Sequence, residues 1–211
     1  MGITGLHPII KPILSRKSII SYKNRTIGVD GHSWLYQIAH IVAEELFYKI
    51  PTTKHAKPFL EKIKKLQRNA IRLVFVFDGD ILVSKEKTNN ERKIRKEKIK
   101  EVVHDYLKAG NLSRAKMLMK QCVSINSDFL NVIIDLLRRE NIEFIISPYE
   151  SDAQLCYLQK IGYIDYILTE DSDLVVYGAD KILYKFDGSY VLEYQKSMLN
   201  KAKDDFFAEN I

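Results

Sequence analysis

Apolar positions along the chain follow two periods, and the alternation between them predicts the fold class. Short runs rich in β-branched and aromatic residues alternate with longer stretches in which apolar residues recur every three or four positions. The first pattern is typical of buried strands and the second of amphipathic helices. Because strands separated by helices form mostly parallel sheets, we expect an α/β three-layer sandwich with a mostly parallel central sheet.

The strand pattern can be placed along the chain. Core strands are expected near 26–30, 72–77, 143–147 and 166–169, and a later pair near 181–186 and 190–194. Gly188 stands between the members of this pair, and a glycine between two short apolar runs is typical of a hairpin turn. The last two strands are therefore a candidate hairpin.

Helical periodicity predicts helices over 33–49, 59–69 and 127–139. The start of the third can be capped by Ser127 or by Asn126, since both types of side chain accept hydrogen bonds from free N–H groups of a first turn. Residues 85–122 form a separate insertion that is highly charged at first and amphipathic after Gly110.

Composition narrows the protein class. With 211 residues and 46% apolar content, the chain is expected to form a single domain over 1–211. A monomer is expected, although the sequence does not determine the oligomeric state. Cys122 and Cys156 lie far apart without the spacing of a zinc site or a disulfide framework, which favours a reducing, intracellular setting. Neither an apolar run of membrane-spanning length nor a secretory signal pattern occurs in the sequence. No membrane association is expected.

Positive charge is concentrated in one segment. Between Lys85 and Lys100 there are eight basic and three acidic residues, a net of +5 out of +6 for the whole chain. A local field of this kind suits a polyanion, and nucleic acid is the leading candidate. The alternative is a solvated helix with pairs such as Glu91 with Arg95.

Acidic residues follow every predicted core strand. Asp30, Asp78, Glu150 and Asp171 stand at these strand ends, and Asp152 and Asp173 come two positions after the last two. Any one of them could simply cap the next helix. In an open α/β sheet, however, the carboxyl ends of the strands meet at the ligand site, so these side chains are expected to converge. Residues two apart share no helix face, which restricts the later pairs to loops or to a helix's first turn.

Six carboxylates in one cleft would repel one another unless cations neutralised them. Oxygen ligands without clustered His or Cys suit Mg²⁺ or Mn²⁺, and two such ions roughly 4 Å apart are a common device for cleaving phosphodiesters. An EF-hand is excluded because Val175 and Val176 replace the required acid and glycine. A haloacid-dehalogenase fold would need more than the 38 residues after Asp173. The acidic cleft and the basic insertion together predict a nuclease.

Several motifs in chain order carry a family resemblance. They are MGITGL at 1–6, VDGHSWLY at 29–36, VFDG at 76–79, PYESDAQLCYL at 148–158 and TEDSDLVVYG at 169–178. Together they resemble the flap endonuclease and xeroderma pigmentosum group G nuclease family. The charged segment that begins SKEKTNNERKIRKEK looks most like the exonuclease 1 branch of that family.

The resemblance implies roles for particular residues. The metal ligands would be Asp30, Asp78, Glu150, Asp152, Asp171 and Asp173, holding two Mg²⁺ ions for which Mn²⁺ can substitute. Lys85 and Arg92 would lie on a helical arch at about 85–122 and hold the scissile phosphate, with Arg95 and Lys96 also contacting DNA. Tyr36 would stack on an unpaired terminal base, although an ordinary core position is the alternative. Gly2 would lie near bound DNA.

The implied activity is that of a Mg²⁺-dependent 5′→3′ exonuclease or flap endonuclease, acting in the nucleus on DNA with a 5′ end, nick or flap. Partners among other repair proteins would be compatible with this role, but the sequence does not identify them. Family members continue into a Gly-x-Asp-Tyr segment with a seventh acid and a helix-two-turn-helix, which this sequence does not include. A weakly catalytic DNA-end or junction binder and a PIN-type RNA endonuclease are the alternatives, and the preference between ends, nicks and flaps stays open.

Overall fold

The computed structural model describes residues 3, 5–80 and 82–201, so Gly2 lies outside the described residues. The chain divides into two compact units. The sheet unit comprises Met1–Ser33, Glu61–Gly79 and Asn141–Ile211, and the helical unit comprises Trp34–Leu60 and Asp80–Glu140. A single domain over 1–211 stays a prediction.

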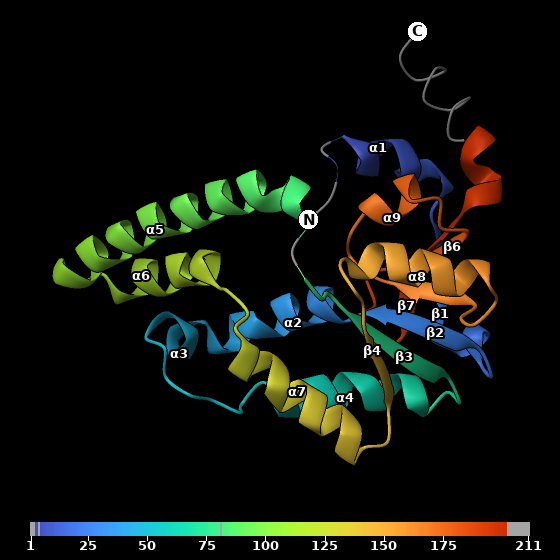
Figure 1. Cartoon of the computed structure of the whole chain (residues 1–211), viewed down its shortest axis with the longest axis horizontal. Helices are drawn as coiled ribbons and strands as arrows, with labels where there is room; N and C mark the ends of the chain where they lie inside the picture. The colour runs from blue at the N-terminus through green and yellow to red at the C-terminus, as the bar shows by residue number, and fades with distance from the viewer. Residues whose placement is uncertain (1–2, 4, 81, 202–211) are drawn as a thin grey trace, which may run out of the picture. The chain divides into compact units, whose positions relative to one another are not determined.

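The sheet unit is built on one seven-stranded sheet with the order β1-β7-β6-β5-β2-β3-β4 (Figure 1). Its strands are β1 (Ser15–Ser18), β2 (Thr26–Asp30), β3 (Arg72–Phe77), β4 (Glu143–Ile146), β5 (Tyr166–Leu168), β6 (Lys181–Tyr184) and β7 (Tyr190–Gln195). Neighbouring strands from β4 to β6 run parallel, whereas β7 is antiparallel to both β6 and β1. The sheet is therefore mostly parallel, as the sequence predicts.

Each predicted strand is present, and the candidate hairpin is confirmed. β6 and β7 pair antiparallel, and Gly188 between them has a φ of 106°, a conformation that side chains disfavour. The edge strand β1 was not predicted, because its four residues, Ser-Arg-Lys-Ser, show no apolar alternation.

One face of the sheet packs against short helices of the same unit. These are α1 (Leu6–Ile10), α8 (Ser151–Lys160) and α9 (Asp173–Val176), which lie on one side of the strands in Figure 1. The 3₁₀ turn η1 (Lys11–Ile13) follows α1 directly, and η2 (Ile19–Tyr22) connects β1 to β2. Val74 and Val76 of β3 share a buried cluster with Leu155 of α8 and Leu174 of α9. At Gly28 of β2 a Cβ would lie only 2.4 Å from Ile164 Cδ1, so this close approach requires glycine.

The opposite face of the sheet is also apolar. Ile27 and Val29 of β2 alternate with the residues that face α8, and they are fully buried, as are Phe75 and Phe77 of β3. The second half of α4 (Ala56–Gln67) belongs to the same unit and buries Ile63 and Leu66 completely. Burial on both faces gives the three-layer arrangement expected of a parallel sheet.

The helical unit contains most of the remaining helices. They are α2 (Gly31–Ala39, from Trp34 onward), η3 (His40–Val42), α3 (Ala43–Phe47), the first half of α4, η4 (Val83–Lys85), α5 (Glu86–Lys108), α6 (Leu112–Met119), η5 (Lys120–Cys122) and α7 (Ser127–Arg139). The insertion expected at about 85–122 is thus a helical pair, in which Val103 of α5 packs against Ala115 and Met119 of α6. None of the described helices is long and apolar enough to span a membrane.

Two helix boundaries differ from the sequence expectation. The prediction of a continuous helix over 33–49 was wrong, because a 3₁₀ turn at His40–Val42 separates α2 from α3. Two adjacent β-branched residues, Ile41 and Val42, weaken helix propensity at this point. The helix expected to begin at Phe59 begins at Ala56, since Pro58 is tolerated in a first turn, whose N–H groups have no partner within the helix.

The start of α7 allows a test of capping. Asn126 Oδ1 accepts a hydrogen bond from Phe129 N at 2.8 Å, and Ser127 is the first residue inside the helix. Asn126→Ala should therefore lower the free energy of unfolding by about 1 kcal/mol. Ser127→Ala should change it by less than about 0.5 kcal/mol. Urea denaturation of both variants measures the difference, and an equal or reversed order would show that Asn126 is not the cap.

Candidate functional site

The sheet topology brings the predicted acids to one edge. From β2 the chain adds β3 and β4 on one side and then returns to place β5 on the other, so the strand order reverses at β2. Such a reversal opens a crevice at the carboxyl ends of the strands. Asp30 is the last residue of β2, and Asp78 follows the end of β3 directly.

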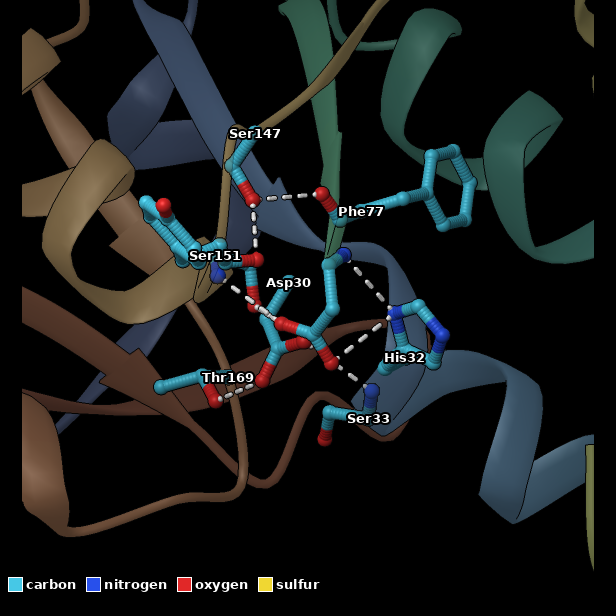
Figure 2. A network of polar contacts seen from close by, with 9 residues as sticks. Asp30, His32, Ser33, Phe77, Ser147, Ser151 and Thr169 are labelled. Atoms are coloured by element: carbon cyan, nitrogen blue, oxygen red, sulfur yellow. Dashed lines mark hydrogen bonds and ion pairs between the residues drawn. The ribbon is translucent and has the colours of Figure 1, made fainter. Parts of the chain in front are cut away.

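Asp30 is buried at this edge, with 5% of its surface exposed. Its carboxylate accepts hydrogen bonds from Thr169 Oγ1 at 2.7 Å and from Ser33 N at 3.0 Å, two of the contacts drawn in Figure 2. Burial raises the pKa of Asp30 to about 6, and the Asp78 charge adds to this, while the two hydrogen bonds oppose it. Burial therefore disfavours the negative charge of Asp30, whereas the hydrogen bonds from Thr169 and Ser33 stabilise it.

Asp78 is held by the start of α8. Its Oδ1 accepts from Ser151 Oγ at 2.7 Å and from Ser151 N at 2.8 Å. His32 lies on the other side: its Nδ1 is 3.1 Å from Asp78 N and 3.2 Å from Asp78 Oδ2. Accepting the backbone N–H requires an Nδ1 without a proton, whereas donating to the carboxylate requires a proton there, so the two contacts belong to different tautomers of the ring.

Asp152 lies in the first turn of α8 and is partly buried. Burial raises its pKa to about 8, and the charges of four other acids contribute. In order of their effect these are Asp30, Asp171, Asp78 and Asp173. The structure therefore gathers five of the six predicted acids into one electrostatically coupled group.

The segment after β5 brings Asp171 and Asp173 beside Asp30. Thr169 Oγ1, which donates to Asp30, also accepts from Asp171 N at 3.0 Å. Asp171 Oδ1 accepts in turn from Asp173 N at 3.1 Å, and Asp173 begins α9. Asp152 and Asp173 thus occupy first turns of helices, one of the two placements that the sequence spacing allowed.

Glu150 is connected to the group through a residue that the sequence analysis missed. Its Oε2 accepts a hydrogen bond from the Tyr177 hydroxyl at 2.8 Å. This bond is the main cause that raises the pKa of Tyr177 to about 12, and the charges of Asp152 and Asp173 also contribute. Tyr177 lies inside the TEDSDLVVYG motif, but nothing in the sequence indicates which side chain its hydroxyl contacts.

The acids do not form a ready coordination shell. Among the residues that the structure describes, no three His, Cys, Asp or Glu side chains are arranged so that they could hold one metal ion. Asp30 and Asp78 instead direct oxygens toward hydroxyl and amide donors. The described acids therefore lie close enough to interact electrostatically, but in this structure they do not surround a metal position.

Apart from Gly2, the remaining predicted site residues belong to the helical unit. Lys85 is the N-cap residue of α5, and Arg92 and Arg95 are exposed along the same helix. Lys96 differs from them, because its Nζ donates to Val123 O at 2.7 Å and to Ser124 Oγ at 2.8 Å, and it lies 6.0 Å from the ring centre of the half-buried Tyr36. The DNA contacts of these residues stay predictions.

Family models match most of the chain. The XPG N-terminal domain matches residues 1–100, and the XPG I-region matches residues 141–208. These two ranges contain all of the acids described above as well as Lys85 and Arg92.

Two curated relatives are similar over nearly the whole chain. The exodeoxyribonuclease 1 of Schizosaccharomyces pombe is 37% identical over 188 residues, which cover 89% of this chain and 33% of the relative. The DNA damage-inducible protein DIN7 of Saccharomyces cerevisiae is 34% identical over 208 residues, which cover 99% of this chain and 47% of the relative. The chain thus spans a third to about half the length of these relatives.

A solved structure, the catalytic core of Rad2 in complex with a DNA substrate, has a similar fold. The TM-score is 0.67 at 26% sequence identity, and the alignment covers 93% of this chain and 55% of the Rad2 chain. The mostly parallel sheet with flanking helices is therefore a fold that this chain shares with the Rad2 catalytic core.

Asp152 gives the site a pH-dependent stability. Because its pKa is raised from 3.8 to about 8, the folded chain without metal should lose stability as the pH rises between these values. Asp152→Asn removes this loss and should stabilise the metal-free chain by about 1–3 kcal/mol at pH 8, with little effect near pH 4. Urea denaturation in EDTA across this range measures the difference between variant and unaltered chain.

The exposed Glu61 of α4 provides the control for this prediction, and Glu61→Gln should give no pH-dependent difference. An Asp152→Asn variant that is less stable than the unaltered chain at pH 8 would contradict the assignment of charge repulsion at this site.

Proposed function

The chain belongs to the XPG nuclease family, and we propose that it hydrolyses DNA phosphodiester bonds near a 5′ end with the help of divalent metal ions. The observation that carries this proposal is the coupled group of acids at the carboxyl edge of the sheet, where burial and mutual repulsion raise the pKa of Asp152. The name of the S. pombe relative, exodeoxyribonuclease 1, agrees with it.

We propose Mg²⁺ as the metal, replaceable by Mn²⁺. The donor set is made of carboxylate oxygens, which these hard cations prefer, and a cation would offset the repulsion that acts on Asp152. The acids named as ligands are Asp30, Asp78, Glu150, Asp152, Asp171 and Asp173. They fit the metal in chemistry and charge, although among the described residues no three of their side chains surround a common point.

Mg²⁺ held by these acids, as two ions in our proposal, would supply Lewis acidity for the phosphate and would lower the pKa of a bound water. The chain's own residues prepare the carboxylates for this. Ser151 fixes Asp78 by two hydrogen bonds, and Thr169 and Ser33 fix Asp30. Carboxylates oriented in this way lose less freedom when they bind a cation or position a phosphodiester.

DNA contacts beyond the acids are proposed for the helical unit. The exposed basic side chains of α5 suit a phosphate backbone, and Lys85 and Arg92 are proposed to hold the scissile phosphate. Arg95, Lys96 and Gly2 would add contacts, and Tyr36 would stack on the terminal base. The Rad2 core in complex with DNA supports DNA as the partner.

We propose a 5′→3′ exonuclease that can also cut flaps, acting in DNA repair in the nucleus. The names of both curated relatives agree with this role. One observation favours a second candidate, a DNA-end binder that cleaves weakly, because the described acids do not form a closed coordination set. Metal-dependent release of nucleotides from an end-labelled duplex and from a matched flap, compared with an EDTA control, separates the two.

Replacement of the acids tests the proposed centre. Asp78→Ala and Asp173→Ala should each lower the cleavage rate by at least about 100-fold at saturating Mg²⁺, since transition-state charge stabilisation of this kind contributes about that much. Both variants should keep the circular dichroism spectrum of the unaltered chain. Glu61→Gln is the matched control. Unchanged cleavage by either alanine variant would remove that residue from the centre.

Lys85 and Arg92, at the start of α5, should act differently from Lys98, which lies further along the helix. Arg92→Ala and Lys85→Ala should lower turnover by about 10-fold or more with little change in duplex affinity, because a phosphate-positioning cation acts mainly in the transition state. Lys98→Ala should weaken binding and reduce its salt dependence by about one counterion. Single-turnover rates and binding isotherms at several salt concentrations measure both effects. Equal binding losses with unaltered turnover in all three variants would contradict the proposed phosphate contact.

A further inference from the structure

Tyr177 connects two helices that carry proposed metal ligands. Its hydroxyl donates to Glu150 Oε2 at 2.8 Å, and its backbone N–H donates to Asp173 O at 3.1 Å. Within the sheet unit, one residue therefore binds the N-terminus of α8 and the turn that begins with Asp173. We propose that Tyr177 is a positioning residue that orients the Glu150 carboxylate for divalent-metal binding, an inference that rests on the proposed function.

The backbone from which Tyr177 projects is firmly placed. Leu174 of α9 is fully buried in the same apolar cluster as Leu155 and Leu158 of α8. Directly after Tyr177, Gly178 adopts a left-handed φ of 86° and donates its N–H to Val175 O at 3.1 Å, which ends the helix. Because α9 is anchored next to α8, the phenol approaches Glu150 from a fixed base.

The cap of its own helix does not orient the Glu150 side chain. It is the N-cap residue of α8, yet its side chain makes no capping hydrogen bond, whereas the Asn126 side chain caps α7. A glutamate has three rotatable side-chain bonds, so an unrestrained carboxylate loses much conformational freedom when it binds an ion. The Tyr177 hydroxyl restricts Glu150 as Ser151 restricts Asp78 and Thr169 restricts Asp30.

The test compares Tyr177→Phe with a matched control in the same part of the fold. Tyr157 of α8 is 57% exposed and Tyr177 is 46% exposed, but no hydrogen bond of the Tyr157 hydroxyl occurs among the described residues. Tyr177→Phe keeps the ring and removes only the donor. Mn²⁺ binding to the 211-residue chain without DNA is measured from the electron paramagnetic resonance of free Mn²⁺.

Tyr177→Phe should raise the Kd for Mn²⁺ by about 10-fold, the lower end of the effect of a residue that orients a ligand. Cleavage should recover at saturating Mn²⁺, and the unfolding midpoint should stay unchanged. Tyr157→Phe should change none of these quantities. An unaltered Kd in Tyr177→Phe would overturn the inference, and so would a cleavage defect that saturating Mn²⁺ leaves in place.

A double-mutant cycle shows whether the effect passes through Glu150. Once Glu150→Gln has removed the charged ligand, adding Tyr177→Phe should weaken Mn²⁺ binding by less than about 2-fold further. An equal loss with and without Glu150→Gln would overturn the positioning role. Failure of the unaltered chain to bind Mn²⁺ or to cleave DNA would instead overturn the proposed function itself. The two failures are therefore distinguishable.

Discussion

Repulsion between carboxylates at one edge of the sheet is the constraint to which the rest of the sheet unit is adjusted. Asp152 interacts unfavourably with four other acids, and Asp30 is buried among them. The chain stabilises this arrangement with hydrogen bonds to the carboxylates. Thr169, Ser33 and Ser151 donate to the acids, and the first turns of α8 and α9 provide further N–H groups. Without these donors, the metal-free fold would place buried charge in an apolar setting.

The short helix α9 provides several of the contacts that position the acids. α9 has only four residues, but it carries an acid at its start, a buried leucine in its middle and Tyr177 at its end. The position of each group is set by the one before it, since a single turn leaves little freedom between them. A longer helix would not orient these side chains better, because the buried Leu174 already anchors α9 next to them.

Much of the sheet and most of the acid group could be predicted from the sequence. Buried parallel strands have strong apolar runs, and an acid after each run marks the edge where the strands end. The polar strand β1 could not be predicted, because its pairing with β7 depends on the fold and not on its own residues. The contacts of Tyr177 and His32 could not be predicted from the sequence either. Tyr177 contacts a residue 27 positions away, and His32 contacts one 46 positions away. Lys96 has the same charge as its neighbours, and only packing shows that its ammonium group is bound by Val123 and Ser124.

The close packing around Gly79, the residue after Asp78, restricts how the site can change during evolution. A Cβ at this position would lie 1.9 Å from Ser147 O and 2.8 Å from Pro148 O, and the Gly79 N–H donates to Tyr149 O at 2.7 Å. Every other side chain would push apart the backbone that leads to Glu150. If Asp78 holds the proposed metal, selection for that activity preserves the acid, whereas selection for folding preserves its neighbour. Lineages that lose the activity should therefore lose the aspartate first and keep the glycine.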